Sequence, residues 1–67
     1  MRIRLNDEIM DYQGAANLES LLQAQGWSLV KGLAVAVNET VIPKSLWSQT
    51  ALADGDVLLV LHATQGG

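Results

Sequence analysis

The chain has no cysteine and only one histidine among its 67 residues. Without cysteine it forms no disulfide and performs no thiol chemistry of its own, and nothing in it indicates an oxidising compartment. One histidine without cysteine makes a structural metal site a poor hypothesis, so we expect no metal. The usual reinforcements of very small folds are therefore missing. Packing of the apolar residues, 49% of the chain, must supply the stability.

Positive charge is also scarce. Four Lys and Arg residues stand against seven Asp and Glu residues, which gives a net charge of −3 and a pI near 4.6. Phosphate binding needs a basic footprint, so we expect no nucleic-acid partner. An acidic surface better fits a partner protein with a basic docking face.

Long apolar runs are absent as well. The two longest, residues 33–37 and 57–61, are far shorter than the ~20 residues of a membrane span. Polar residues follow Met1–Arg4 closely, unlike a signal peptide. We therefore expect a cytoplasmic protein with no membrane partner. The chain is also too small for a deep pocket and shows no nucleophile–base pair or phosphate loop, so we expect no catalytic residue and no enzyme.

The N-terminal residues predict a β-hairpin. Residues 1–5 and 9–12 alternate between apolar and polar side chains, as half-buried strands do. The tip is formed by residues 6–7 or by residues 7–8, and both registers keep the same faces because they differ by two residues. In both registers, Asp11 lies opposite Arg2 or Arg4 on the solvated face, and the core side chains are Ile3, Leu5, Met10 and Tyr12.

A short helix follows the hairpin. Asn17 is a suitable N-cap because its side-chain oxygen accepts a hydrogen bond from a free backbone N–H. Leu18, Leu21 and Leu22 form one apolar stripe, and Gly26 fits a left-handed C-terminal cap. A helix this short must rest on a sheet.

The second half of the chain predicts further strands and turns. Its expected segments are a strand at 33–37, a turn at 38–40, a short strand at 41–42 ended by Pro43, a helical turn at 44–48 that buries Leu46 or Trp47, a tight turn at 53–56 and a strand at 57–61. We therefore predict an α+β domain with one main helix packed on one face of a mixed four- to five-stranded sheet.

The last strand is apolar on both faces, although a single helix covers only one. We expect Leu58 and Val60 to point inward. Leu59 and Leu61, with His62 after them, would then form a docking surface, because exposed apolar patches usually mark interaction sites. The alternative is that Trp27 or Trp47 folds over that face.

Several segments of the chain jointly carry a resemblance to a known family: Leu5-Asn6-Asp7, Leu21-Leu22, Val35-Ala36-Val37-Asn38, Val41-Ile42-Pro43, Trp47, Leu52-Ala53-Asp54-Gly55-Asp56 and Gly66-Gly67. On these segments the whole chain resembles the ubiquitin-like β-grasp fold, and within it the ThiS family of sulfur carriers. A MoaD-like carrier for molybdopterin synthesis and a ubiquitin-like protein modifier are alternatives that use the same terminus, and an interaction module with an inert tail is a third. The segment His62-Ala63-Thr64-Gln65 departs from the family pattern, which more often has an apolar residue and Ala there.

The resemblance implies one domain, 1–67, with a folded body at 1–61 and a flexible functional tail at 62–67. It implies that a ThiF-like adenylyltransferase uses ATP to activate the Gly67 carboxylate. A persulfide donor of the cysteine desulfurase type then supplies the sulfur of a thiocarboxylate, and thiazole synthase, ThiG, receives it for thiamine biosynthesis. Gly66 would let the tail thread a narrow channel. No cofactor would be bound permanently.

Other polar residues have simpler interpretations. Asp54 and Asp56 suit a turn before a strand and need no metal to explain them. His62 has no nucleophile to serve in this chain, so we interpret it as an exposed residue where the last strand ends.

Overall fold

The computed structural model describes residues 1–27 and 30–62. The elements run along the chain in the order β1 (Arg2–Leu5), β2 (Glu8–Asp11), α1 (Leu18–Ala24), β3 (Leu33–Val37), β4 (Thr40–Ile42), the short 3-10 helix η1 (Lys44–Gln49) and β5 (Val57–His62). Within the described ranges, no helix has the length and apolar character needed to cross a bilayer.

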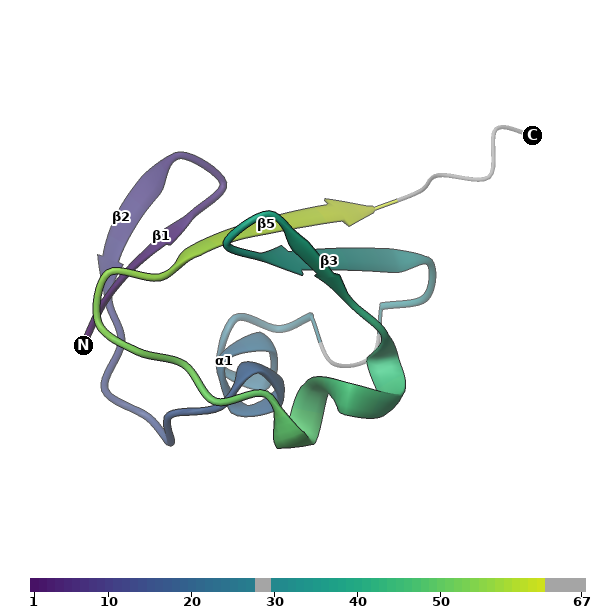
Figure 1. Ribbon diagram of the computed structural model, residues 1–67, viewed down its shortest axis with the longest axis horizontal. Helices are drawn as coiled ribbons and strands as arrows, with labels where there is room; N and C mark the ends of the chain where they lie inside the picture. The colour runs from purple at the N-terminus through teal and green to yellow at the C-terminus, as the bar shows by residue number, and fades with distance from the viewer. Residues whose placement is uncertain (28–29, 63–67) are drawn as a thin grey trace.

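All five strands form one mixed sheet in the order β2-β1-β5-β3-β4. The last strand therefore lies at the centre, parallel to β1 on one side and antiparallel to β3 on the other. Figure 1 shows both helices below the sheet, so they cover the same face. The predicted α+β arrangement, with one main helix on one face of a mixed sheet, is confirmed.

Both hairpins turn through two residues that have positive φ. Leu5 pairs with Glu8, which places residues 6–7 at the tip and Asp11 opposite Arg2. Of the two registers left open by the sequence, the first is therefore correct. In the second hairpin Val37 pairs with Thr40. The turn is thus formed by residues 38–39, and Thr40, expected in the turn, belongs to β4.

The helix begins and ends as its sequence predicts. Asn17 Oδ1 accepts a hydrogen bond from the Ser20 N–H at 2.8 Å. Gly26 has a φ of 81°, the left-handed conformation that favours glycine. The three leucines of the apolar stripe, Leu18, Leu21 and Leu22, are fully buried.

The core lies between the helices and the inner face of the sheet. Trp47, rather than Leu46, is the residue of η1 that is buried, and its Nε1–H donates to the Ile42 carbonyl at 2.9 Å. Leu5 and Met10, both expected in the core, are partly buried and pack against it. The buried apolar side chains are Ile3, Tyr12, Leu18, Leu21, Leu22, Val35, Trp47, Leu52, Leu58 and Val60.

Candidate docking face

The central strand β5 has one buried face and one exposed face. Leu58 and Val60 are 1% and 4% exposed, whereas Leu59 and Leu61 are 47% and 55% exposed. The predicted orientation of the strand is confirmed. Each exposed leucine keeps about half of its surface in water, although apolar burial is favourable by roughly 25 cal/mol per Å².

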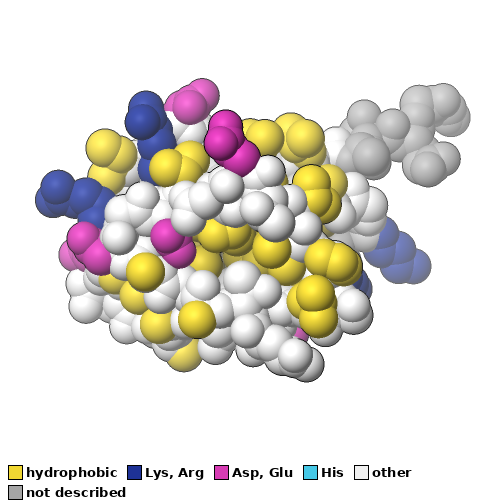
Figure 2. All heavy atoms as spheres, in the orientation of Figure 1, with side chains coloured by type: hydrophobic (Ala, Val, Ile, Leu, Met, Phe, Trp, Pro, Cys, Tyr) yellow, Lys and Arg dark blue, Asp and Glu magenta, His cyan; other side chains and the backbone are white. Residues whose placement is uncertain are grey.

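The exposed side of the sheet is apolar beyond β5. Strand pairing places Ala36 beside Leu59 and Ala34 beside Leu61. Val41 pairs with Ala36 from the other side and is 71% exposed. Paired residues share a face of the sheet. We call the apolar side chains of this side the outer face; they are the exposed Ile9, Ala34, Val41, Val57, Leu59 and Leu61 and the half-buried Ala36. In Figure 2, hydrophobic side chains lie along the upper side, where Figure 1 shows the sheet, with acidic side chains among them.

Sequence reasoning found only the part of the outer face that β5 contributes. Val41 joins it because β3 lies between β4 and β5, a neighbour relationship that no local pattern reveals. Ile9 joins it because it pairs with Arg4, whose neighbour on β5 is Val57. The alternation of the first hairpin was the signal that could have identified Ile9.

The alternative, in which a tryptophan covers the outer face, is wrong. Trp47 is 5% exposed and belongs to the core cluster on the opposite side of the sheet. Trp27 is partly buried and packs against that same cluster. Among the described residues, neither tryptophan lies over Leu59 or Leu61, which keep 47% and 55% of their surface exposed.

Two asparagines hold β5 from its two edges. Asn6 continues the β1 side of the ladder: its Nδ2 donates to the Val60 carbonyl at 3.1 Å, and its Oδ1 accepts from the Val60 N–H at 2.8 Å. On the β3 side, Asn38 Oδ1 accepts from the Val57 N–H at 2.9 Å, while the Asn38 N–H donates to the Val57 carbonyl at 2.8 Å. Sequence reasoning missed this clamp. Its only local signal is an asparagine at the first position of each hairpin turn.

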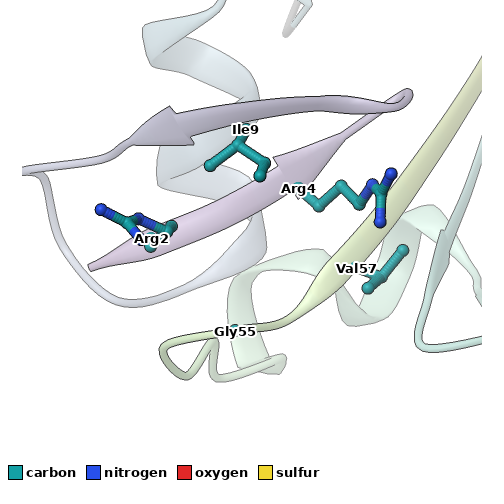
Figure 3. A pocket seen from close by; sticks show the side chains of 5 residues that line it. All are labelled: Arg2, Arg4, Ile9, Gly55 and Val57. Carbon is teal, nitrogen blue, oxygen red and sulfur yellow. The ribbon is translucent and has the colours of Figure 1, made fainter.

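Two arginines border a hollow at the β1 end of the outer face. Arg2, Arg4, Ile9, Gly55 and Val57 line a space of about 200 Å³, which we call the arginine hollow. Figure 3 shows both arginine side chains on the same strand, with Ile9 and Val57 nearby. Arg2 and Arg4 are exposed, as the interpretation of a solvated strand face requires.

The carboxylates before β5 belong to the turn. Asp54 Oδ1 accepts from the Arg2 N–H at 2.6 Å. Asp56 accepts from the Ala53 N–H at 2.9 Å and from Asn38 Nδ2 at 3.0 Å. Among the residues that the structure describes, no group of three or more His, Asp or Glu side chains is placed to hold a metal ion. These contacts agree with the interpretation of both aspartates as turn residues.

His62 is the last residue of β5 rather than the first residue of a tail. It is exposed and pairs with Leu33. The strand thus extends one residue past the expected boundary at 61. The predicted sulfur-carrying residue Gly67 and the predicted threading residue Gly66 lie outside the described residues.

The mixed sheet with one main helix on its inner face and an open apolar outer face defines a small ubiquitin-like β-grasp domain. The sequence profile of the ThiS family matches residues 3–67. The chain is 31% identical to the sulfur carrier protein ThiS of Escherichia coli (strain K12), over the full length of both. The chain therefore belongs to the ThiS family.

Solved structures agree with this assignment. The crystal structure of the thiamine biosynthesis protein ThiS from Geobacter metallireducens is similar with a TM-score of 0.84 and 26% identity, and the match covers all of both chains. The solution structure of a thiamine biosynthesis protein from the same organism gives a TM-score of 0.79 at 26% identity and covers all of this chain and 88% of the other. The predicted β-grasp fold is thereby confirmed.

Proposed function

We propose that this ThiS-family chain is a sulfur carrier protein of thiamine biosynthesis, and that the carboxylate of Gly67 carries the sulfur. The observation that carries the proposal is the family match over residues 3–67, which includes both terminal glycines. The exposed outer face supports it, because a carrier must be held by other proteins while they act on its terminus.

The chemistry requires an activated acyl group. A carboxylate is a poor electrophile, so a ThiF-like enzyme would join the Gly67 carboxylate to the AMP portion of ATP and release pyrophosphate. A persulfide sulfur would then attack the acyl carbon and displace AMP, which forms an acyl disulfide. A second thiol would cleave that disulfide to leave the anionic thiocarboxylate. Thiazole synthase, ThiG, would take the sulfur from it.

The folded body would supply recognition and leave catalysis to its partners. Leu59 and Leu61, about half exposed on the outer side of β5, would dock against the partner, with His62 at the strand's end. Gly66, which lacks a Cβ, would pass through a channel too narrow for larger residues. The chain would thus be a co-substrate rather than an enzyme, and ATP would bind to the activating enzyme.

Intact-mass analysis tests this proposal. The chain is incubated with ATP, the ThiF-like enzyme, cysteine and a cysteine desulfurase. We expect the mass gain of one oxygen exchanged for one sulfur, localised to Gly67 by fragmentation. A variant that ends at Gln65 is the control and should gain nothing. The same gain in that variant, or no gain in the full chain, would contradict the proposal.

Further experiments separate the alternative functions. A MoaD-like carrier would pass its sulfur to a molybdopterin-forming synthase and not to thiazole synthase. A ubiquitin-like modifier would give high-mass conjugates in cell extracts that disappear when Gly67 is removed. An interaction module with an inert tail would work equally well without both glycines. The ThiS match favours the thiazole route over these three.

A further inference from the structure

A groove crosses β5 between the tips of the two hairpins. It has a volume of about 210 Å³ and is lined by Asn6, Asp7, Ala36, Glu39, Val57, Leu58 and Leu59. We call it the turn groove. Pockets for drug-sized ligands are larger, at ~300–1,000 Å³. The turn groove is therefore suited to a single side chain of a partner rather than to a small-molecule cofactor.

The turn groove combines an apolar lining with acidic side chains. Val57 and Leu59 are each 47% exposed, so their surface is available for contact. Asp7 and Glu39, the second residues of the two turns, are exposed. Neither forms an ion pair with another described residue. An aliphatic stem with a positive charge at its end matches this combination, because Arg and Lys place their methylenes on apolar surface and keep the charged group at its margin.

Resting on the proposed carrier function, we propose that the turn groove receives a basic side chain, Arg or Lys, from the activating enzyme that docks on the outer face. The stem contacts Val57 and Leu59, and the cation lies within reach of Asp7 and Glu39. The net charge of −3 adds a long-range attraction for such a basic surface.

The arginine hollow, which lies next to the turn groove, would repel a basic side chain and so restrict how the partner can be oriented. Val57 lines both spaces, so the acidic turn groove and the hollow bordered by Arg2 and Arg4 adjoin on the same face. A basic side chain placed in the arginine hollow would meet two like charges. Repulsion there fixes the orientation of the partner, and with it the direction in which the carrier terminus is presented.

The two asparagines make the turn groove a preformed site. Asn6 and Asn38, the residues that precede Asp7 and Glu39, are bonded to the backbone of Val60 and Val57. The two turns are therefore tied to the strand that forms the floor. A preformed site loses less freedom on binding than a mobile one.

The first experiment removes the two charges and keeps the shapes. Asp7→Asn combined with Glu39→Gln should raise the Kd for the ThiF-like enzyme, measured by calorimetry without ATP, about tenfold at low salt. The KM of the chain for adenylation should rise by a similar factor with kcat unchanged. High salt should weaken wild-type binding toward that of the variant, because salt screens exposed charges.

A matched control distinguishes the effect of the turn-groove charges from the effect of overall net charge. Glu8→Gln combined with Glu19→Gln also removes two negative charges, but these belong to β2 and α1 and lie outside the groove lining. We expect its Kd to stay within about twofold of wild type. An equal loss in this control would show that only overall charge matters, which would overturn the assignment of the groove.

A second variant excludes damage to the fold. Asp7 and Glu39 have φ values of 69° and 71°, which glycine adopts without strain. Asp7→Gly with Glu39→Gly should therefore keep the thermal midpoint while weakening binding as the charge-removing pair does.

The outcomes distinguish this inference from the carrier function. If the wild type forms the thiocarboxylate and neither pair of substitutions at Asp7 and Glu39 weakens binding, the role assigned to the turn groove is overturned and the carrier function is left intact. If both pairs of substitutions at Asp7 and Glu39 weaken binding while the Glu8 and Glu19 control does not, and the wild type gains no sulfur, the role of the turn groove is supported and the carrier chemistry is rejected. A loss that is independent of salt would reject a charged occupant. Absence of any wild-type binding would overturn both proposals.

Discussion

The two faces of β5 have nearly the same composition and opposite environments. Leu58 and Val60 are packed under the helices, while Leu59 and Leu61 keep about half of their surface in water. A domain with one helical layer can bury only one side of its sheet. The comparison shows that apolar character in such a strand serves stability on one face and, by our proposal, recognition on the other.

Substitution on the inner face should have the largest effect on stability. Leu58→Ala removes a fully buried side chain from the centre of the core, and we expect it to lower the free energy of unfolding by about 2–5 kcal/mol. Urea denaturation followed by tryptophan fluorescence would measure this. In so small a domain the variant is expected to be partly unfolded without denaturant. A loss below ~1 kcal/mol would mean that Leu58 is not central to the core.

Removal of Asn6, one of the two asparagines that hold β5, should have an intermediate effect on stability. Asn6→Ala leaves the Val60 N–H and carbonyl without their hydrogen-bond partner, which we expect to cost about 1–3 kcal/mol of unfolding free energy. Gln13→Ala is a matched control, because it removes an exposed side-chain amide whose one hydrogen bond within the described ranges is to the Asp11 carboxylate.

Hydrogen exchange locates the effect of the Asn6 substitution. The Val60 amide should exchange faster in Asn6→Ala, whereas an amide at the far side of the sheet should follow the global change alone. Unchanged protection of Val60 would contradict a local role for Asn6.

Substitution on the outer face should have the smallest effect on stability and a clear effect on docking. Leu59→Thr with Leu61→Thr retains residues that favour strands, so we expect the unfolding free energy to change by less than about 1 kcal/mol. Binding to the activating enzyme should weaken about tenfold or more, because apolar contacts at the centre of an interface dominate its energy. Equal affinities for the variant and wild type would show that the outer face does not bind the activating enzyme.

Much of the local structure could be predicted from the sequence. Alternation in residues 1–5 set which side chains face the core, and Asn17 and Gly26 marked the ends of the helix. The first hairpin retained two possible registers. Its register depends on residues 6–7 adopting positive φ, with Asn6 anchored to a strand that begins fifty-one positions later in the chain. Local patterns contain no such contact.

The candidate site was predicted in part for the same reason. The alternation of β5 identified Leu59 and Leu61, since that signal lies within one strand. Val41 lies beside Leu59 and Leu61 only because β3 pairs with both β4 and β5. Asp7 and Glu39 line one groove only because β5 is inserted between β1 and β3. Strand insertion is a non-local event, and the hairpins that flank it are separated by the helix.

The sequence by itself determined the identity of the strands, the caps of the helix, the buried leucine stripe and the inward side of β5, because each depends on residues within a few positions of one another. Only the tertiary structure decided the hairpin register, the asparagine clamp, the breadth of the outer face and the groove between the turns. The physical reason is that these features depend on hydrogen bonds and contacts between distant segments, as between Asn6 and Val60.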